Sequence, residues 1–132
     1  MTGNSVALDT SAAVALVNNA ELARRFLHQF QTVFLPAPAL GEFLFGAANS
    51  QRRDTNEAIF EAFVTGCTVL PITAATARVY VRIRLDLKRR GLPIPVNDLW
   101  IASVCLEHQL PLATSDAHSG HIAELRTLNP YA

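Results

Sequence analysis

Four acidic side chains of this chain stand far in sequence from any lysine or arginine: Asp9, Glu42, Asp98 and Asp116. Glu42 is the only charged side chain in residues 26–51, and residues 91–125 contain no lysine or arginine. Carboxylates that gather in one place repel one another and raise each other's pKa values unless a cation intervenes. Hard oxygen donors of this kind suit Mg²⁺ or Mn²⁺. The chemistry that these residues could support is therefore that of a divalent metal site.

Each acid also has a purely structural interpretation. Asp9, Asp98 and Asp116 stand where helices are expected to begin, and aspartate is a favoured N-cap residue. Glu42 could be an exposed residue on a helix that is otherwise rich in phenylalanine and leucine. The hypothesis of a shared site rests on the four acids together, because one site would explain all of them.

The elements that must position these acids alternate between two patterns. Short apolar runs predict strands at 5–9, 32–37, 68–72 and 111–116, and a terminal extended piece at 127–132. Helical spacing or caps predict helices at 10–19, 21–30, 38–50, 56–66, 73–90, 96–109 and 121–126. This alternation predicts a three-layer α/β/α sandwich around a mostly parallel sheet. Active sites of such folds gather beyond the carboxyl ends of the strands, where Asp9 and Asp116 would lie.

Length and composition limit the possible classes of protein. The 132 residues, half of them hydrophobic and 17% charged, suit one globular domain over residues 1–132. No apolar run reaches the roughly 20 residues of a membrane span, and the N-terminus lacks the pattern of a signal peptide. Cys67 and Cys105 fit no metal-ligand spacing, so we interpret them as free, buried thiols of a cytoplasmic protein.

The net charge of zero argues against a protein that coats nucleic acid by bulk electrostatics. The distribution of the charges along the chain is more informative. Six of the eleven basic residues fall within 78–90. Arginine suits phosphate geometry, so this segment could hold nucleic-acid phosphates, although for any single arginine a solvated helix face is the favoured interpretation.

Four features of the sequence form a known pattern: "LDTSAAVAL" at the start, Glu42 in the helix after the second strand, "PVNDLWIASVC", and "LATSD" near the end. Together they resemble the PIN-domain nucleases, and within them most closely the VapC toxins of type II toxin–antitoxin pairs. The resemblance covers essentially the whole chain. It implies a Mg²⁺- or Mn²⁺-dependent endoribonuclease with Asp9, Glu42, Asp98 and Asp116 as the catalytic quartet. Of these, Asp9, Asp98 and Asp116 would ligate the metal.

The resemblance also implies roles around the quartet. Hydroxyl groups and basic side chains would support the acids and the RNA substrate, namely those of Thr10, Ser11, Thr114, Arg82 and Arg89. Many relatives carry an aromatic residue shortly after the last acid, whereas "DAHSGH" offers His118 and Ser119, which leaves the contribution of Asp116 open. His118 and His121, three residues apart, could ligate a metal or touch substrate, but we favour surface residues, because a pair of histidines alone is a weak metal signal.

Two kinds of partner follow from the same resemblance. A small antitoxin protein would lie across the acidic edge, and the nuclease would form a homodimer. An exposed apolar surface around Leu22, Phe26 and Phe45 would serve these contacts. Among the aromatic residues, we expect Trp100, Phe43, Phe45, Phe60 and Phe63 to lie in the core because of their helical spacing.

Other functions remain as alternatives. A catalytically silent PIN-like module that binds protein or RNA is the main one. An aspartyl-phosphate phosphatase would need a second aspartate two residues after Asp9, where the chain has Ser11. Dinucleotide or ATP binding lacks the necessary glycine-rich motif.

Overall fold

The computed structural model describes residues 4–131, so the ends of the predicted domain 1–132 lie outside the described residues. A five-stranded sheet with strand order β3-β2-β1-β4-β5 forms its centre, and all neighbouring strands run parallel. Its strands are β1 (Ser5–Leu8), β2 (Thr32–Pro36), β3 (Thr68–Leu70), β4 (Leu112–Ala113) and β5 (Thr127–Leu128). The predicted parallel α/β sheet is thus confirmed.

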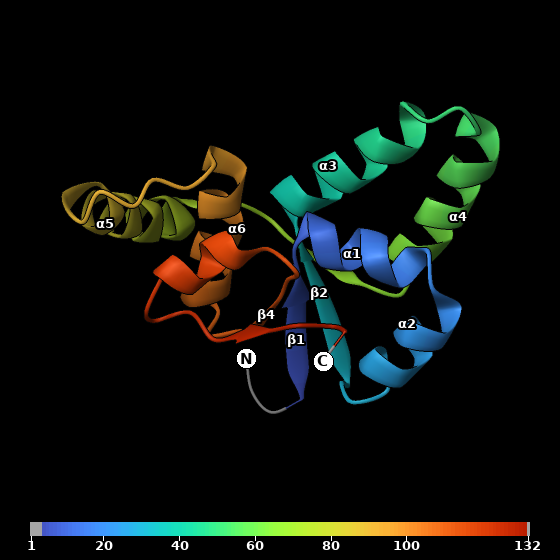
Figure 1. The fold of residues 1–132 in the computed structure, drawn as a ribbon, viewed down its shortest axis with the longest axis horizontal. Coiled ribbons are helices and arrows are strands. Elements are labelled where there is room, and N and C mark those ends of the chain that lie inside the picture. Colours follow the sequence, from blue (N-terminus) through green and yellow to red (C-terminus); the bar gives the residue numbers. More distant parts are fainter. Residues whose placement is uncertain (1–3, 132) are drawn as a thin grey trace.

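Six helices and one 3₁₀ turn connect these strands within the described residues. They are α1 (Thr10–Val17), α2 (Ala20–Leu27), α3 (Ala37–Ala48), α4 (Arg53–Thr65), α5 (Ala74–Arg89), α6 (Val96–Glu107) and the turn η1 (Ala117–His121). Figure 1 shows α1, α2 and α4 on one side of β1 and β2, and α5 and α6 on the other. Helices on both faces of the sheet give the predicted three-layer sandwich. No helix in this part of the chain is both long and apolar enough for a transmembrane span.

The order of the strands creates a crevice at one edge of the sheet. From β1 the chain moves outward through β2 and β3, and it then returns to add β4 on the opposite side of β1. The two connections leave the carboxyl ends of β1 and β4 in opposite directions, and such a reversal opens a crevice between them. Residues that follow β1 and β4 therefore meet at this point.

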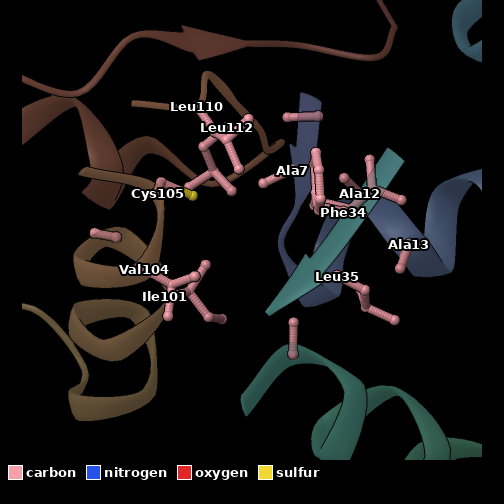
Figure 2. Packing of buried hydrophobic residues seen from close by; sticks show 14 of the residues in the cluster. Ala7, Ala12, Ala13, Phe34, Leu35, Ile101, Val104, Cys105, Leu110 and Leu112 are labelled. Atoms are coloured by element: carbon pink, nitrogen blue, oxygen red, sulfur yellow. The ribbon is translucent and has the colours of Figure 1, made fainter. Parts of the chain in front are cut away.

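The core consists of apolar layers on both faces of the sheet. Val6, Ala7 and Leu8 of β1 are fully buried, as parallel strands covered on both faces require. Figure 2 shows Ile101, Val104 and Cys105 of α6 on one side of β1 and β2, and Ala12 and Ala13 of α1 on the other. Cys105 is buried and Cys67 only partly so, and both are free thiols.

Local signals set the starts of several helices. Asn19 caps α2 by accepting a hydrogen bond of 3.0 Å from the Leu22 amide. Thr73 and Thr76 form a reciprocal capping box at the start of α5. The long segment 73–90, which alternates like a strand over part of its length, is therefore helical as predicted.

The segment after β4 differs from the prediction. The sequence favoured a strand over 111–116 and a helix over 121–126, but β4 has only two residues, η1 covers 117–121, and 122–126 is not helical. Asp116 ends the extended segment because its side chain accepts a hydrogen bond from the His118 amide and begins the 3₁₀ turn. Ile122 and Leu125 are both buried, so their spacing of three residues imitates a helical pattern.

The predicted apolar surface is also partly wrong. Leu22 and Phe26, four residues apart on one face of α2, are 3% and 7% exposed and belong to the core. Phe45, expected in the core with the other aromatic residues, is 67% exposed. It lies two residues after the fully buried Phe43, which puts it on the opposite side of α3.

Phe43 anchors α3 against α4 and provides a test of the packing. Its ring stacks on Phe60 at a centroid distance of 4.4 Å and contacts Phe63 at 5.5 Å. We expect Phe43→Ala to lower the free energy of unfolding by about 3 to 5 kcal/mol in urea titrations, because it leaves a cavity in the core. Phe45→Ala, in the same helix, should change it by less than about 0.5 kcal/mol. Similar losses for both variants would contradict this packing.

Candidate functional site

Asp9 follows β1 directly and is held by three hydrogen-bond donors. Its Oδ1 accepts the Ala12 amide at 2.8 Å and the Ser11 hydroxyl at 2.7 Å, and its Oδ2 accepts the Thr114 hydroxyl. The residue is only 6% exposed. Burial raises the pKa of Asp9, the three hydrogen bonds lower it, and the charge of Asp116 raises it further, with a net increase. Asp9 is thus an N-cap, as the structural interpretation held, and also a buried acid in a crevice.

Asp116 reaches the same crevice from the segment after β4. Its backbone amide donates to the Thr114 hydroxyl at 2.9 Å, and that hydroxyl in turn donates to Asp9. One threonine side chain therefore couples the two aspartates across adjacent parallel strands. The Asp116 carboxylate also caps η1, which fixes its orientation.

Asp98 lies in the first turn of α6, whose N-cap is Pro95, so it does not cap this helix. Burial raises the pKa of Asp98, and the charges of Asp116, Asp9 and Glu42 raise it further, in that order, while His118 lowers it. Ligand atoms of Asp98, Asp116 and His118 lie within 4.8 Å of one another, and Asp9 and Glu42 are near enough for their charges to act on Asp98. The structure thus brings all four predicted acids together at one edge of the sheet.

Glu42 projects from α3 on its exposed side. Its Oε1 accepts a hydrogen bond of 2.6 Å from the Thr10 hydroxyl, which links α3 to the start of α1. The apolar residues around Glu42 in sequence do not surround it in space, since the neighbouring Phe43 points into the core. Glu42 therefore combines access to water with a position fixed by Thr10, and its charge acts on Asp98.

The predicted supporting residues separate into two groups. Thr10, Ser11 and Thr114 donate hydrogen bonds to the acids, in agreement with hydroxyl support. Arg82 forms an exposed ion pair with Glu124, and Arg89 is exposed near the end of α5. The hydroxyl groups thus belong to the acidic cluster, while the two arginines lie on α5.

No lysine or arginine forms an ion pair with any of the four acids within residues 4–131. The arginines that do form ion pairs bind other carboxylates, as in Arg24–Glu21, Arg53–Glu57, Arg82–Glu124 and Arg90–Asp86. Apart from His118, whose Nδ1 lies 3.0 Å from Oδ1 of Asp116, the repulsion between the four acids is thus left to water, to protons or to a cation. Carboxylate oxygens in this number fit a divalent metal ion.

His118, which the sequence analysis favoured as a surface residue over a metal ligand, lies at this site. One ligand atom from each of Asp98, Asp116 and His118 can be chosen so that all lie within 4.8 Å of one another, a spacing suited to holding a metal ion. The spacing of His118 and His121 was only a weak metal signal, and it gave no indication that His118 would lie beside Asp98. The position of His118 only two residues after a predicted ligand could have drawn attention to it.

Comparisons with known proteins identify the family to which this chain belongs. The profile of the PIN domain family matches residues 6–125. The ribonuclease VapC5 of Mycobacterium tuberculosis is 30% identical over 110 residues, which cover 83% of this chain and 81% of that protein. The tRNA(fMet)-specific endonuclease VapC of Shigella flexneri is 30% identical over 123 residues, which cover 91% and 93% of the two chains.

Solved structures show the same fold. A chain in the DNA-bound VapBC structure of Salmonella typhimurium superimposes with a TM-score of 0.89 at 25% identity, over 97% of this chain and 99% of that one. A chain of VapBC-5 from Mycobacterium tuberculosis gives a TM-score of 0.78, also at 25% identity, over 96% and 99%.

The raised pKa of Asp98 leads to a prediction for metal-free protein. Its folded-state pKa lies above the unfolded value, so its contribution to stability is full below the unfolded pKa and is lost as pH rises through the folded one. In the presence of a chelator, Asp98→Asn should therefore have a higher Tm than the parent protein at about pH 7.5. This difference in Tm should vanish below about pH 4. Because Asp98 is partly exposed, screening limits the gain to about 1 kcal/mol, or a few degrees.

Glu61→Gln, at an exposed acid of α4, is the matched control and should show no such pH-dependent gain. Thermal melts across this pH range check both variants. A lower Tm for Asp98→Asn than for the parent protein at about pH 7.5 would mean that the acids do not destabilise one another.

Proposed function

The chain belongs to the PIN domain family, among its VapC-like members, and on this premise we propose that it is a metal-dependent endoribonuclease, the toxin of a toxin–antitoxin pair. One observation carries the proposal. Asp98 is close enough to three other acids for their charges to raise its pKa, and no arginine or lysine within the described residues forms an ion pair with any of the four. A binding module would have no need for such a cluster.

The chemical roles follow from how each side chain is held. Asp9, Asp98 and Asp116 would hold Mg²⁺ or Mn²⁺ through carboxylate oxygens. When bound, the ion would supply a water of lowered pKa and neutralise negative charge on the scissile phosphate. Glu42, exposed and fixed by Thr10, would orient that water and accept its proton. Ser11 and Thr114 keep Asp9 oriented, as supporting residues commonly do for metal ligands.

The substrate and partners are proposed from the relatives. Two of them are named as a ribonuclease and a tRNA-specific endonuclease, which supports RNA as the substrate class. Exposed arginines of α5, including Arg89, would hold RNA phosphates outside the metal site. The neighbouring structures of VapBC complexes support a small VapB-like antitoxin as partner. A homodimer and a cytoplasmic location complete the proposal.

The first experiment measures metal binding and RNA cleavage together. We expect Mn²⁺ or Mg²⁺ to raise Tm. At an ion concentration one hundred times Kd, binding would add about 2.7 kcal/mol to the free energy of unfolding. Asp98→Asn should abolish this shift and reduce cleavage of total RNA by about 100-fold or more, because it removes a direct ligand.

Glu61→Gln should keep both properties, since this acid is exposed on α4. Undiminished cleavage by Asp98→Asn would refute the proposed site. A parent protein that melts identically with and without divalent ions would instead favour the catalytically silent binding module.

The shared hydroxyl of Thr114 gives an independent test of positioning. Thr114→Val keeps the shape of the side chain but removes the donor to Asp9 and the acceptor for the Asp116 amide. We expect the Kd for Mn²⁺, measured by calorimetry, to rise about 10- to 100-fold. Thr55→Val, at an exposed threonine of α4, should leave the Kd unchanged. An unaltered Kd for Thr114→Val would show that Asp9 does not need this hydroxyl.

A further inference from the structure

The imidazole of His118 lies directly beside a carboxylate of the acidic cluster. Its Nδ1 is 3.0 Å from Oδ1 of Asp116, and its backbone amide donates to the same oxygen at 2.9 Å. The side chain is 52% exposed and that of Asp116 is 34% exposed. A ring nitrogen therefore stands at the open side of the site, next to a proposed ligand.

The turn that carries His118 is fastened to the rest of the fold. Ser119, its neighbour, is 5% exposed. The guanidinium of Arg90 donates to the backbone oxygen of His121 at 2.7 Å, and Arg82 forms an ion pair with Glu124. Each contact with α5 is worth little alone, but together they hold the C-terminal end of the turn and the segment that follows it. His118 is thus presented by an anchored segment.

The spacing of the donor atoms matches that of metal ligands. Neighbouring ligands of an octahedral ion with bonds of about 2.1 Å lie about 3.0 Å apart, and opposite ligands about 4.2 Å. The distance of 3.0 Å between Nδ1 of His118 and Oδ1 of Asp116 equals the first value. Ligand atoms of Asp98, Asp116 and His118 lie within 4.8 Å of one another, so small side-chain rotations would complete the set.

Resting on the proposed metal-dependent function, we infer that His118 is a direct metal ligand and that the site consequently prefers Mn²⁺ to Mg²⁺. Mg²⁺ binds oxygen donors in near-ideal octahedral geometry and gains little from an imidazole. Transition-metal ions accept imidazole nitrogen together with carboxylate oxygen. A set with one nitrogen therefore favours Mn²⁺ over Mg²⁺ more strongly than the carboxylates alone would.

The alternative role of His118 is purely positional. Its Nδ1–H would then donate to Asp116 and orient that carboxylate, while only oxygen atoms contact the ion. Both roles predict weaker metal binding when His118 is removed. They differ in whether nitrogen is bonded to the metal, and in whether Mn²⁺ is affected more than Mg²⁺.

The test uses the full-length protein loaded with Mn²⁺ and examined by electron spin-echo envelope modulation. We expect the parent protein to show hyperfine coupling between Mn²⁺ and ¹⁴N. His118→Ala should lose this coupling, whereas His121→Ala, at the other histidine of the same turn, should keep it. By calorimetry, His118→Ala should raise the Kd for Mn²⁺ at least tenfold and the Kd for Mg²⁺ less than about threefold.

Absence of ¹⁴N coupling in the parent protein, coupling that persists in His118→Ala, or equal loss of affinity for both ions would overturn the inference. Mn²⁺ binding by Asp98→Asn shows whether only the role of His118 is wrong or whether the proposed metal site is wrong as well. If Mn²⁺ binding depends on Asp98 but shows no nitrogen coupling, only the role of His118 is wrong. If Asp98→Asn binds Mn²⁺ as tightly as the parent protein, the metal site itself is wrong.

Discussion

Mutual repulsion among carboxylates at one edge of the sheet is the constraint on which the rest of this structure depends. Burial raises the pKa values of Asp9 and Asp98, and the charges of neighbouring acids raise both further. The arginines that form ion pairs do so with other acids in the described part of the chain. Placing these carboxylates close together costs free energy. Such an arrangement persists only where packing and hydrogen bonds elsewhere fix the positions of the side chains. A divalent cation is the simplest partner that would turn this cost into binding energy.

The fold meets the constraint with few contacts. Adjacent parallel strands bring the segments after β1 and β4 together, and one hydroxyl, that of Thr114, couples Asp9 to Asp116. Asp9 and Asp116 each begin a helical segment while taking part in the cluster. Helix capping and membership of the site are therefore compatible, because a carboxylate has enough lone pairs to accept a backbone amide and other partners.

Much of the fold could be predicted from the sequence because the signals are local. Alternating apolar runs and helical spacing specified the parallel sheet and its layers, and the family resemblance named the four acids that the structure brings together. The structure around and after Asp116 could not be predicted. Asp116 looks in the sequence like the end of a strand, whereas its side chain begins a 3₁₀ turn. Ile122 and Leu125 are buried at a spacing of three residues, which is also the spacing of a helix face. The exposure of Phe45 and the neighbours of His118 depend on tertiary packing, which spacing alone does not encode.

Anomalous diffraction at the manganese absorption edge, from crystals grown with Mn²⁺, tests the central claim most directly. The account predicts an anomalous peak in the crevice beyond β1 and β4, within bonding distance of carboxylate oxygens of Asp98 and Asp116. A well-ordered crevice without a peak, in crystals where Mn²⁺ occupies some other surface, would contradict it.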